Sequence, residues 1–182
     1  MNKGIVEGKG SNMMKSLLEW GICIIVALVI AILINKFVLF KVYIPSESMV
    51  PTLNVEDQLF VTRIYNYDKI KRGDILVFYS EEFDDTYIKR VIGLPGDEVS
   101  IENGVVYVNN EKLEEDYVKN VDTTFTKSYT VPEGKYFFLG DNRPVSKDSR
   151  MWDNPFVDQK DIKAKAQLKV YPFSDFGWIN KD

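Results

Sequence analysis

The chain has 182 residues and a formal net charge of −4 at pH 7, which leaves room for one domain with a real core plus an appendage. The acidic balance argues against nucleic acid as a partner, because such binding needs a concentrated basic surface to displace counterions from phosphates. The sequence contains no histidine, which excludes a histidine-ligated zinc site and a Ser-His-Asp triad, and we expect no metal and no other cofactor.

The first element expected along the chain is a membrane-spanning helix. Segment 20–40 is apolar apart from Asn35 and Lys36, and its 21 residues would extend over about 31 Å as a helix, enough for a bilayer core. The uninterrupted part, 21–34, has only 14 residues, a length that also suits a cleaved signal peptide or a buried core helix. No A-x-A-like pair of small residues follows it, so we expect an uncleaved transmembrane anchor over 17–40.

The lysines that flank the span set its expected orientation. Three precede it and two lie at its far end: Lys3, Lys9, Lys15, Lys36 and Lys41. This weak positive-inside bias predicts a cytoplasmic tail over 1–16 and an extracytoplasmic domain over 41–182, in a single-pass protein of the cell membrane. The only cysteine, Cys23, lies inside the span, so no intramolecular disulfide can form.

After the anchor, short runs rich in β-branched and aromatic residues recur, and turn signals separate them. Examples are "QLFVTRI", "ILVFY", "EVSIENGVVYVN" and "AKAQLKVYPF". In the third run, Asn103-Gly104 is a strong signal for a two-residue hairpin. A helical period is hard to find past residue 41. The pattern predicts a mostly β fold, in which a barrel-like, mainly antiparallel β catalytic domain follows the single helix.

Two stretches interrupt this pattern with charged and polar residues, "SEEFDDT" at 80–86 and "LEEDYVKNVDTTFT" at 113–126. Charged runs are usually solvated faces, so both are interpreted as polar surface loops. The sequence does not indicate what either loop contacts.

The motif "IPSESMVPTL" at 44–53 places Ser46 and Ser48 between prolines, which fix the backbone angle φ. A serine becomes a nucleophile only when a neighbouring base takes its proton. Without histidine, the candidate bases are a carboxylate, a lysine or a free terminal amine, and the long anchor argues against the amine. A lysine must be neutral to act as the base, which requires apolar surroundings that lower its pKa from about 10.4 to about 7–8.

Lys89 is the lysine best placed for such burial. It lies in the strand-like run "TYIKRVIGLPG", which also contains Tyr87, Ile88, Val91 and Ile92. With a period of two, its side chain projects opposite to that of Ile88, and a lysine on a buried strand face is costly unless it has a use. Lys89 is therefore the best candidate for the base.

Four motifs resemble the characteristic boxes of type I signal peptidases, the membrane-anchored Ser-Lys proteases that remove signal peptides from exported proteins. They are "IPSESMVPTL", "RGDILVF", "YIKRVIGLPGD" and "GDNRPVSKDSR", in the family's order behind an N-terminal span. The resemblance extends over residues 15–172 and is strongest to the Gram-positive-type bacterial members. It implies a serine endopeptidase whose partners are the signal peptides of secretory pre-proteins and the lipid bilayer.

The resemblance also implies a role for individual residues. Ser48 matches the nucleophile and Lys89 the general base, the same lysine that the apolar run indicates. The backbone N–H of Ser48 and the hydroxyl of Ser46 match the oxyanion hole, whose donors stabilise the charge that develops on the scissile carbonyl. Ser146 matches a serine that hydrogen-bonds the catalytic lysine. The charged residues that match supporting positions are Asp141, Asp148, Arg90 and Arg150.

Further positions match the pockets that accept small side chains at −1 and −3 of the signal peptide. They are Ile44, Pro45, Met49, Leu53, Tyr87 and Ile88. For Met49 and Leu53, a place in the core is an equally good interpretation. The sequence departs from the family pattern at Asp153 and Ala164, where glycine is usual, and neither position carries chemistry.

Other interpretations exist for two parts of the site. The Ser46 hydroxyl could cap its own turn. Asp141 and Asp148 could form a carboxylate pair for acid/base catalysis, but the adjacent Arg143 and Arg150 favour ionised carboxylates in structural salt bridges.

Two other functions share some of these features. Self-cleaving repressor-like proteins also use a Ser-Lys dyad, but they are soluble and carry a helical DNA-binding domain, whereas this chain has an expected anchor and no basic helix. A membrane-anchored, non-catalytic β domain that binds pre-proteins would keep the anchor and the fold. Because every residue of the dyad is present, the peptidase is the expected function.

Overall fold

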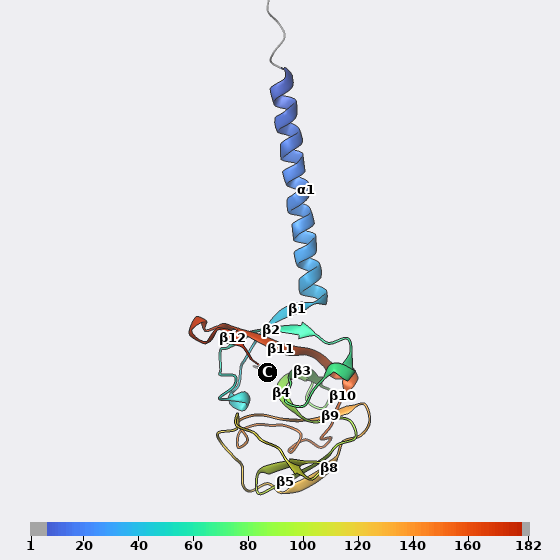
Figure 1. Cartoon of the computed structure of the whole chain (residues 1–182), viewed down its shortest axis with the longest axis vertical. Helices are drawn as coiled ribbons and strands as arrows, with labels where there is room; N and C mark the ends of the chain where they lie inside the picture. Colours follow the sequence, from blue (N-terminus) through green and yellow to red (C-terminus); the bar gives the residue numbers. More distant parts are fainter. Residues whose placement is uncertain (1–6, 180–182) are drawn as a thin grey trace, which may run out of the picture. The chain divides into compact units, whose positions relative to one another are not determined.

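The computed structural model describes residues 7–179, with side chains from residue 13 onward. The chain divides into two compact units, one ending at Leu39 and the other beginning at Phe40. The first contains one long helix, and the second contains two β-sheets (Figure 1).

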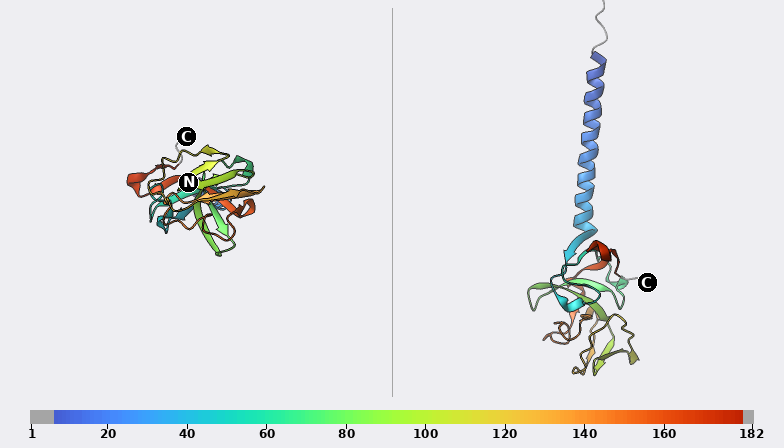
Figure 2. Two further views of the ribbon diagram at one scale, coloured as in Figure 1. Left: turned by 90° about the horizontal axis from the view of Figure 1, so that it is seen from below. Right: turned by 90° about the vertical axis from the view of Figure 1, so that its left-hand side faces the viewer.

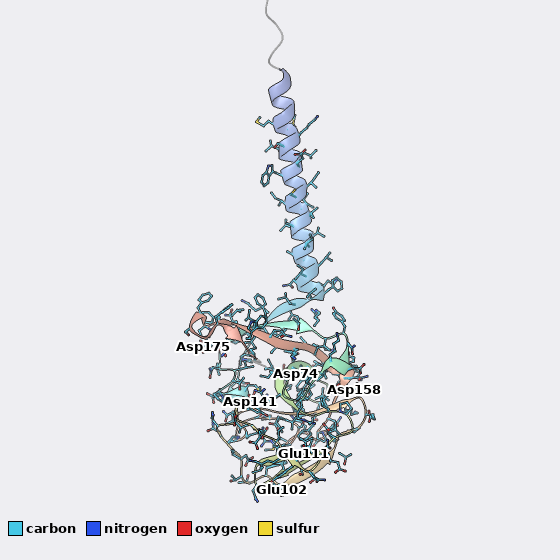
Figure 3. All side chains as sticks on the ribbon, viewed as in Figure 1. Asp74, Glu102, Glu111, Asp141, Asp158 and Asp175 are labelled. Atoms are coloured by element: carbon cyan, nitrogen blue, oxygen red, sulfur yellow. The ribbon has the colours of Figure 1, made fainter. Side chains whose placement is uncertain are left out.

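Helix α1 (Glu7–Phe37) is long and apolar enough to cross a membrane over Met13–Phe37. These 25 residues extend over about 37 Å at 1.5 Å per residue. The most apolar stretch has no buried side chain, and Figure 3 shows side chains projecting from the helix on all sides. An apolar helix without a buried face suits a lipid environment better than a protein core. The helix ends three residues before the expected end of the span, because Leu39 already begins a strand.

The second unit is built on an eight-stranded sheet. Its strands run in the order β1-β2-β11-β3-β4-β9-β10, and β12 pairs with β11 outside this path. The strands are β1 (Leu39–Tyr43), β2 (Gln58–Arg63), β3 (Ile75–Ser80), β4 (Asp85–Gly93), β9 (Lys135–Leu139), β10 (Val157–Asp158), β11 (Ile162–Tyr171) and β12 (Gly177–Trp178). Strand β4 pairs antiparallel with β3 on one edge and with β9 on the other. Strand β4 therefore lies in the interior of the sheet and not at an edge.

A smaller sheet lies at one end of this unit, where β5 and β8 are labelled in Figure 1, and Figure 2 gives two further views. Its order is β7-β6-β5-β8, with β5 (Glu98–Glu102), β6 (Val105–Val108), β7 (Glu111–Lys112) and β8 (Lys127–Thr130). Asn103 and Gly104 join β5 to β6 with φ of 50° and 81°, as a two-residue hairpin requires. The predicted hairpin is confirmed.

The mostly β, antiparallel character is confirmed, but the sheets are not closed into a barrel. The path of the large sheet begins at β1 and ends at β10, and these end strands are not neighbours in it. The chain between β4 and β9 forms the separate small sheet instead of extending the large one. Register shifts in β11 and between β4 and β9 bend the large sheet without closing it.

Three clusters of buried hydrophobic side chains hold this arrangement together. The first joins the loop 44–53 to β2, β3 and β11. The second contains Phe78, Phe138 and Trp152. The third packs Ile92 of β4 against side chains of β5, β6 and β8, and so attaches the small sheet to the large one. Four single-turn 3₁₀ helices lie in the connections: η1 (Glu47–Met49), η2 (Tyr67–Lys69), η3 (Gln159–Asp161) and η4 (Phe173–Asp175).

The two positions that depart from the family pattern adopt ordinary backbone conformations. Asp153 is not among the described residues with positive φ, and its N–H donates to Glu82 Oε1 at 3.3 Å. Ala164 is fully buried in β11, opposite Arg63 and Val77 of the flanking strands. Neither position requires a glycine.

Gly93, at the end of β4, lies where the two sheets meet. An added Cβ would lie 2.7 Å from Val131 Cγ2 and 2.8 Å from Val99 Cγ2. Gly93→Ala should therefore lower the free energy of unfolding by about 1–3 kcal/mol through overpacking, seen as a lower Tm of the detergent-solubilised protein. Gly177→Ala is the control, because beyond its chain neighbours no atom lies within 4 Å of the added Cβ, and its Tm should not change. An unchanged Tm for Gly93→Ala would contradict this packing.

Candidate active site

Ser48 lies in the middle of η1, on a turn that is held from two sides. Met49 and Leu53 are fully buried and anchor the turn to the first hydrophobic cluster. From the segment after β9, the N–H of Asn142 donates to the carbonyl of Ser48 at 3.1 Å. The side-chain amide of Asn142 donates to the carbonyl of Glu47 at 3.2 Å. Packing and hydrogen bonds together fix the serine.

Lys89 reaches the Ser48 hydroxyl from β4. Its Nζ lies 2.6 Å from Ser48 Oγ, and the residue is only 3% exposed. Burial lowers the pKa of Lys89 to about 8, against the opposing influence of Asp148 and Asp141, which raise it. Near pH 8 about half of the amine is neutral and able to accept the serine proton.

The Ser46 hydroxyl lies 3.3 Å from Ser48 Oγ. Ser46 occupies the N-cap position of η1, but its side chain makes no capping hydrogen bond. The alternative interpretation, a hydroxyl that caps its own turn, is therefore not what the structure has. The Ser46 hydroxyl is directed at the same point as Lys89.

Asp141 is fully buried and is held by Arg90, the residue after Lys89 on β4. Arg90 Nε donates to Asp141 Oδ1 at 2.9 Å and Arg90 Nη2 donates to Asp141 Oδ2 at 2.7 Å, a bidentate pair. The hydroxyl of Thr52, from the loop that contains Ser48, donates to the same carboxylate. Asp141, labelled in Figure 3, thus connects β4 to the loop of the serine.

Asp148 is the second fully buried carboxylate, and Arg150 holds it. Arg150 Nε donates to Asp148 Oδ1 at 2.8 Å, and the N–H of Gly140 donates to Asp148 Oδ2 at 3.0 Å. Arg143, which the sequence places beside these carboxylates, pairs with Glu115 instead. Each carboxylate has its own arginine, so the structural interpretation fits better than a shared-proton pair.

Ser146 lies at the site, but its implied hydrogen bond to Lys89 is absent. The residue is 3% exposed, and among the described residues its Oγ has no hydrogen-bond partner. Ser146 Oγ and the Ser48 carbonyl both lie against Gly140, where a Cβ would collide with each of them. The expected hydrogen bond between Ser146 and Lys89 is therefore wrong, because in the structure the Lys89 amine points to Ser48.

A cleft of about 440 Å³ opens in front of the dyad. It is lined by Pro45, Ser46, Glu47, Ser48, Asp85, Thr86, Tyr87, Ile88, Lys89, Val145 and Lys147. Of the six positions assigned to substrate pockets, the structure brings Pro45, Tyr87 and Ile88 to the cleft.

The other three, Ile44, Met49 and Leu53, do not line the cleft. They are at most 1% exposed and belong to the first hydrophobic cluster, against which Ile88 also packs. Their assignment to the substrate pocket is therefore corrected, because their side chains pack in the hydrophobic core.

Sequence reasoning missed several residues of the site. Thr52 and Asn142 hold the loop of the serine, and Gly140 lets the segments approach each other. The motif "GDNRPVSKDSR" contains two of them, but their partners are distant in sequence and no local pattern indicates them. Two charged residues that line the cleft were likewise not singled out: Glu47, in "IPSESMVPTL", and Lys147, in "GDNRPVSKDSR".

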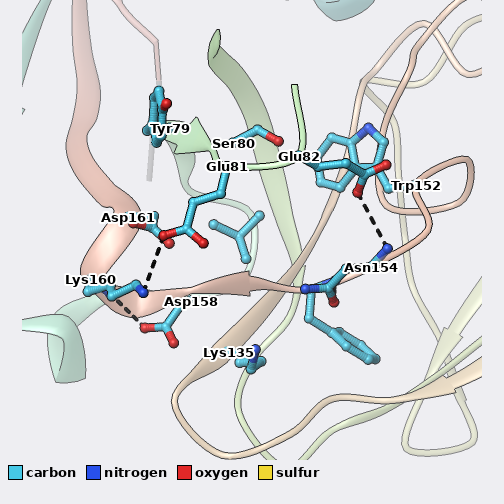
Figure 4. A pocket seen from close by; sticks show the side chains of 12 residues that line it. Tyr79, Ser80, Glu81, Glu82, Lys135, Trp152, Asn154, Asp158, Lys160 and Asp161 are labelled. Carbon is cyan, nitrogen blue, oxygen red and sulfur yellow. Dashed lines mark hydrogen bonds and ion pairs between the residues drawn. The ribbon is translucent and has the colours of Figure 1, made fainter. Parts of the chain in front are cut away.

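A second hollow, of about 120 Å³, lies elsewhere between the turn after β3 and the segment 152–161 (Figure 4). Three of its acidic residues have partners: Glu81 pairs with Lys160 at 3.4 Å, Glu82 accepts the N–H groups of Asp153 and Asn154, and Asp158 accepts the N–H of Lys160. No group of three or more Asp, Glu or Cys side chains among the described residues is arranged to hold a metal ion. The hollow offers no nucleophile with a base.

Comparison with known proteins supports the implied relationship. The family model described as "Signal peptidase, peptidase S26" matches residues 17–171. Signal peptidase IB of Staphylococcus aureus is 39% identical over 183 aligned residues, which cover 90% of this chain and 94% of that protein. Signal peptidase I of Bacillus licheniformis is 37% identical, covering 94% of this chain and 97% of that protein. A crystal structure of a signal peptidase I from Enterococcus faecalis is 38% identical, covers 53% of this chain and 96% of that chain, and has a TM-score of 0.47.

The depressed pKa of Lys89 carries a stability penalty. Its folded pKa of about 8 lies below the ordinary value of 10.5, so the protonated amine is disfavoured by about 3 kcal/mol below pH 8. The penalty disappears as the pH rises from 8 to 10.5, because the unfolded chain then also loses the proton. Lys89→Met should raise the free energy of unfolding at pH 7 by about 1–3 kcal/mol, with a smaller gain at pH 10.

Urea denaturation at both pH values measures this gain. Lys147→Met is the matched control, because Lys147 is exposed and its replacement should change stability little. A Lys89→Met protein that is less stable than wild type at pH 7 would show that the buried amine is net stabilising.

Proposed function

The chain belongs to the signal peptidase family, peptidase S26, and is a serine endopeptidase that removes signal peptides; we propose that it does so with a Ser48–Lys89 dyad through an acyl-enzyme, cutting after small residues. The proposal depends above all on the 2.6 Å contact between Lys89 Nζ and Ser48 Oγ, made by a lysine that is 3% exposed. In a chain without histidine, a buried amine beside a serine hydroxyl supplies the base that a nucleophilic serine needs.

The proposed reaction has two stages. Neutral Lys89 takes the proton of Ser48 Oγ, which attacks the scissile carbonyl carbon, and the protonated amine then gives this proton to the leaving nitrogen as the C–N bond breaks. The mature protein departs with the new N-terminus, and the signal peptide stays as an ester on Ser48. Lys89 next takes a proton from water, whose oxygen attacks the ester. The amine then returns this proton to Ser48 Oγ as the ester bond breaks and the signal peptide is released.

The oxyanion of each tetrahedral intermediate needs hydrogen-bond donors. We assign these to the backbone N–H of Ser48 and to the hydroxyl of Ser46, which lies 3.3 Å from Ser48 Oγ. One such donor is worth about 3 kcal/mol in the transition state. Because η1 is held by Asn142 and by buried side chains, the donors are in place before the substrate arrives.

The charged residues act on the dyad without touching the substrate. Arg90 and Arg150 each pair with one buried carboxylate, Asp141 and Asp148, and these two pairs join β4, the loop of the serine and the segment 140–150. We propose that they keep the geometry of the dyad and limit how far the carboxylates raise the pKa of Lys89. Ser146, whose buried hydroxyl belongs to this segment, is assigned to the same supporting group.

The preference for small residues follows from what lies around the cleft. Ile88, which lines the cleft, packs against the cluster that contains Ile44, Met49 and Leu53, and those side chains fill the space behind it. A core packed in this way has no room for a large side chain without rearrangement. This packing supports the proposal that the side chains at −1 and −3 are small.

We further propose that the enzyme acts at the outer face of the cell membrane. Residues 1–16 would form a cytoplasmic tail, 17–40 the anchor and 41–182 the extracytoplasmic catalytic domain, following the lysines around the span. The β unit exposes aromatic side chains near its C-terminal end, Tyr171, Phe173, Phe176 and Trp178, a residue type favoured at membrane interfaces. A tethered enzyme and a membrane-inserted signal peptide share the same surface, which raises their effective concentration.

Removing either member of the dyad should stop cleavage. Detergent-solubilised wild type, Ser48→Ala, Lys89→Ala and Lys89→Arg are incubated with a pre-protein, and the new N-terminus of the product is sequenced. We expect wild type to cut after a small residue, and each variant to lose at least about 10³-fold in rate while it stays folded. Lys89→Arg fails because arginine stays protonated.

The contrary results are distinct. Equal cleavage by all four proteins would contradict the dyad mechanism. Cleavage by none of them would favour a membrane-anchored domain that binds pre-proteins without cutting them. Labelling with an acylating inhibitor separates these cases, since a competent enzyme is labelled at Ser48 and a binding domain is not.

The rate should depend on pH through Lys89. Its pKa is lowered to about 8, so the neutral base becomes the main form above pH 8, and kcat/KM should rise about tenfold per pH unit below this value and level off above it. Initial rates measured from pH 6 to 10 give this profile. A rate that is flat across this range would argue against Lys89 as the base.

A further inference from the structure

The segment 113–126, here named the strap, connects β7 to β8 and contains no helix or strand. The sequence predicts a solvated polar loop, but in the structure its side chains contact the arginines around the dyad. Its contacts are made by Glu115, Tyr117, Asn120, Asp122 and Phe125. The strap is therefore part of the surroundings of the site.

Tyr117 contacts Arg90, the residue that follows Lys89 in the chain. Its ring covers the guanidinium of Arg90, whose Cζ lies 3.8 Å from the ring centroid. Arg90 is the arginine that forms the bidentate pair with Asp141. A cation close to an aromatic face and partly desolvated is held firmly there. Tyr117 thus closes the side of Arg90 that would otherwise face water.

The hydroxyl of Tyr117 fixes the ring in turn. It donates to Glu115 Oε1 at 2.8 Å, and Glu115 pairs with Arg143, whose Nη1 lies 3.2 Å from Glu115 Oε2. Arg143 Nε donates to the carbonyl of Gly140 at 3.0 Å. Burial, together with Glu115, raises the pKa of Tyr117 above its ordinary value, so the hydroxyl keeps its proton throughout the working pH range.

Three more contacts attach the rest of the strap. Asp122 lies 3.4 Å from Arg150, and the Phe125 ring lies 5.7 Å from the same guanidinium. The Asn120 amide donates at 3.2 Å to Asn142, which in turn holds the loop of Ser48. All three arginines of the site are therefore covered by one segment.

We propose that Tyr117 is a positioning residue for the dyad: it fixes Arg90 against Asp141, and so keeps the negative charge of Asp141 compensated beside Lys89. The inference rests on the proposed function, because it assumes that Lys89 is the base. If the ring is lost, Arg90 gains freedom toward solvent, Asp141 is less well compensated, and Lys89 holds its proton to higher pH.

The direction of this effect follows from the groups around Lys89. Asp148 and Asp141 both favour the protonated amine, and each is compensated by one arginine. The Tyr87 ring, 5.5 Å from the amine on the same strand, also favours the cation. Other charged residues line the cleft in front of the amine: Glu47, Asp85 and Lys147. Of these groups, only Asp141 depends on an arginine that Tyr117 covers.

The test is the pH profile of kcat/KM for the full-length, detergent-solubilised enzyme. Tyr117→Leu removes the ring, and Tyr117→Phe keeps the ring while removing the bond to Glu115. We expect the acid limb of Tyr117→Leu to move up by about half a pH unit, which is about a threefold loss at pH 7 that vanishes above pH 9. Tyr117→Phe should move less. Lys119→Ala on the same strap, whose amine donates to the carbonyl of Asp116, is the control and should match wild type.

A fluorinated ring keeps the test decisive if Tyr117→Leu does not fold. Trifluorophenylalanine at position 117, compared with Tyr117→Phe, keeps the shape and weakens only the attraction between ring and cation. Its acid limb should again lie higher. The proposal is overturned if the limb stays in place in the folded variants, or if activity falls equally at all pH values, as a purely structural role would give.

The same data keep the two proposals apart. If wild type shows no acid limb, or if Lys89→Ala cleaves like wild type, the dyad itself is wrong. If wild type and Lys89→Ala behave as proposed and the ring variants do not shift the limb, only the role of Tyr117 is wrong.

Discussion

The proposed chemistry of this protein depends on one buried amine, that of Lys89. Strand β4 pairs on both edges and brings the amine to Ser48 Oγ in surroundings that lower its pKa to about 8. A protonated lysine is disfavoured there by about 3 kcal/mol, which the rest of the fold must offset. The same burial that lowers stability leaves part of the Lys89 amine neutral near pH 8, as the proposed base requires.

A buried amine can stay neutral only if nearby charges are compensated. Asp141 and Asp148 are fully buried close to Lys89, and each would hold a proton on the amine if it stood alone. Arg90 and Arg150 bind them in bidentate fashion, and backbone N–H and hydroxyl groups complete their hydrogen bonds. These pairs contribute less to stability than to geometry, because desolvation cancels much of their attraction.

The chain between β4 and β9 forms the second sheet and also contributes contacts to the site. Ile92 of β4 packs against the small sheet, and the strap between β7 and β8 returns to cover the arginines of the site. Arg90 follows Lys89 directly on β4, so one strand presents the base to the serine and the supporting cation to the strap. Coverage on this side limits the access of water to the ion pairs and strengthens them.

The sequence by itself determined the apolar helix, the antiparallel strands, the hairpin at Asn103-Gly104 and the burial of Lys89, because each depends on neighbours within one short segment. Only the tertiary structure decided that the sheets stay open, that Met49 belongs to the core and that Ser146 lacks its expected bond to Lys89. It also placed Glu115 and Tyr117 of the strap against arginines of the site. Contacts such as Glu115 with Arg143 join residues 28 positions apart, and no local period or propensity encodes which distant charge a side chain will meet.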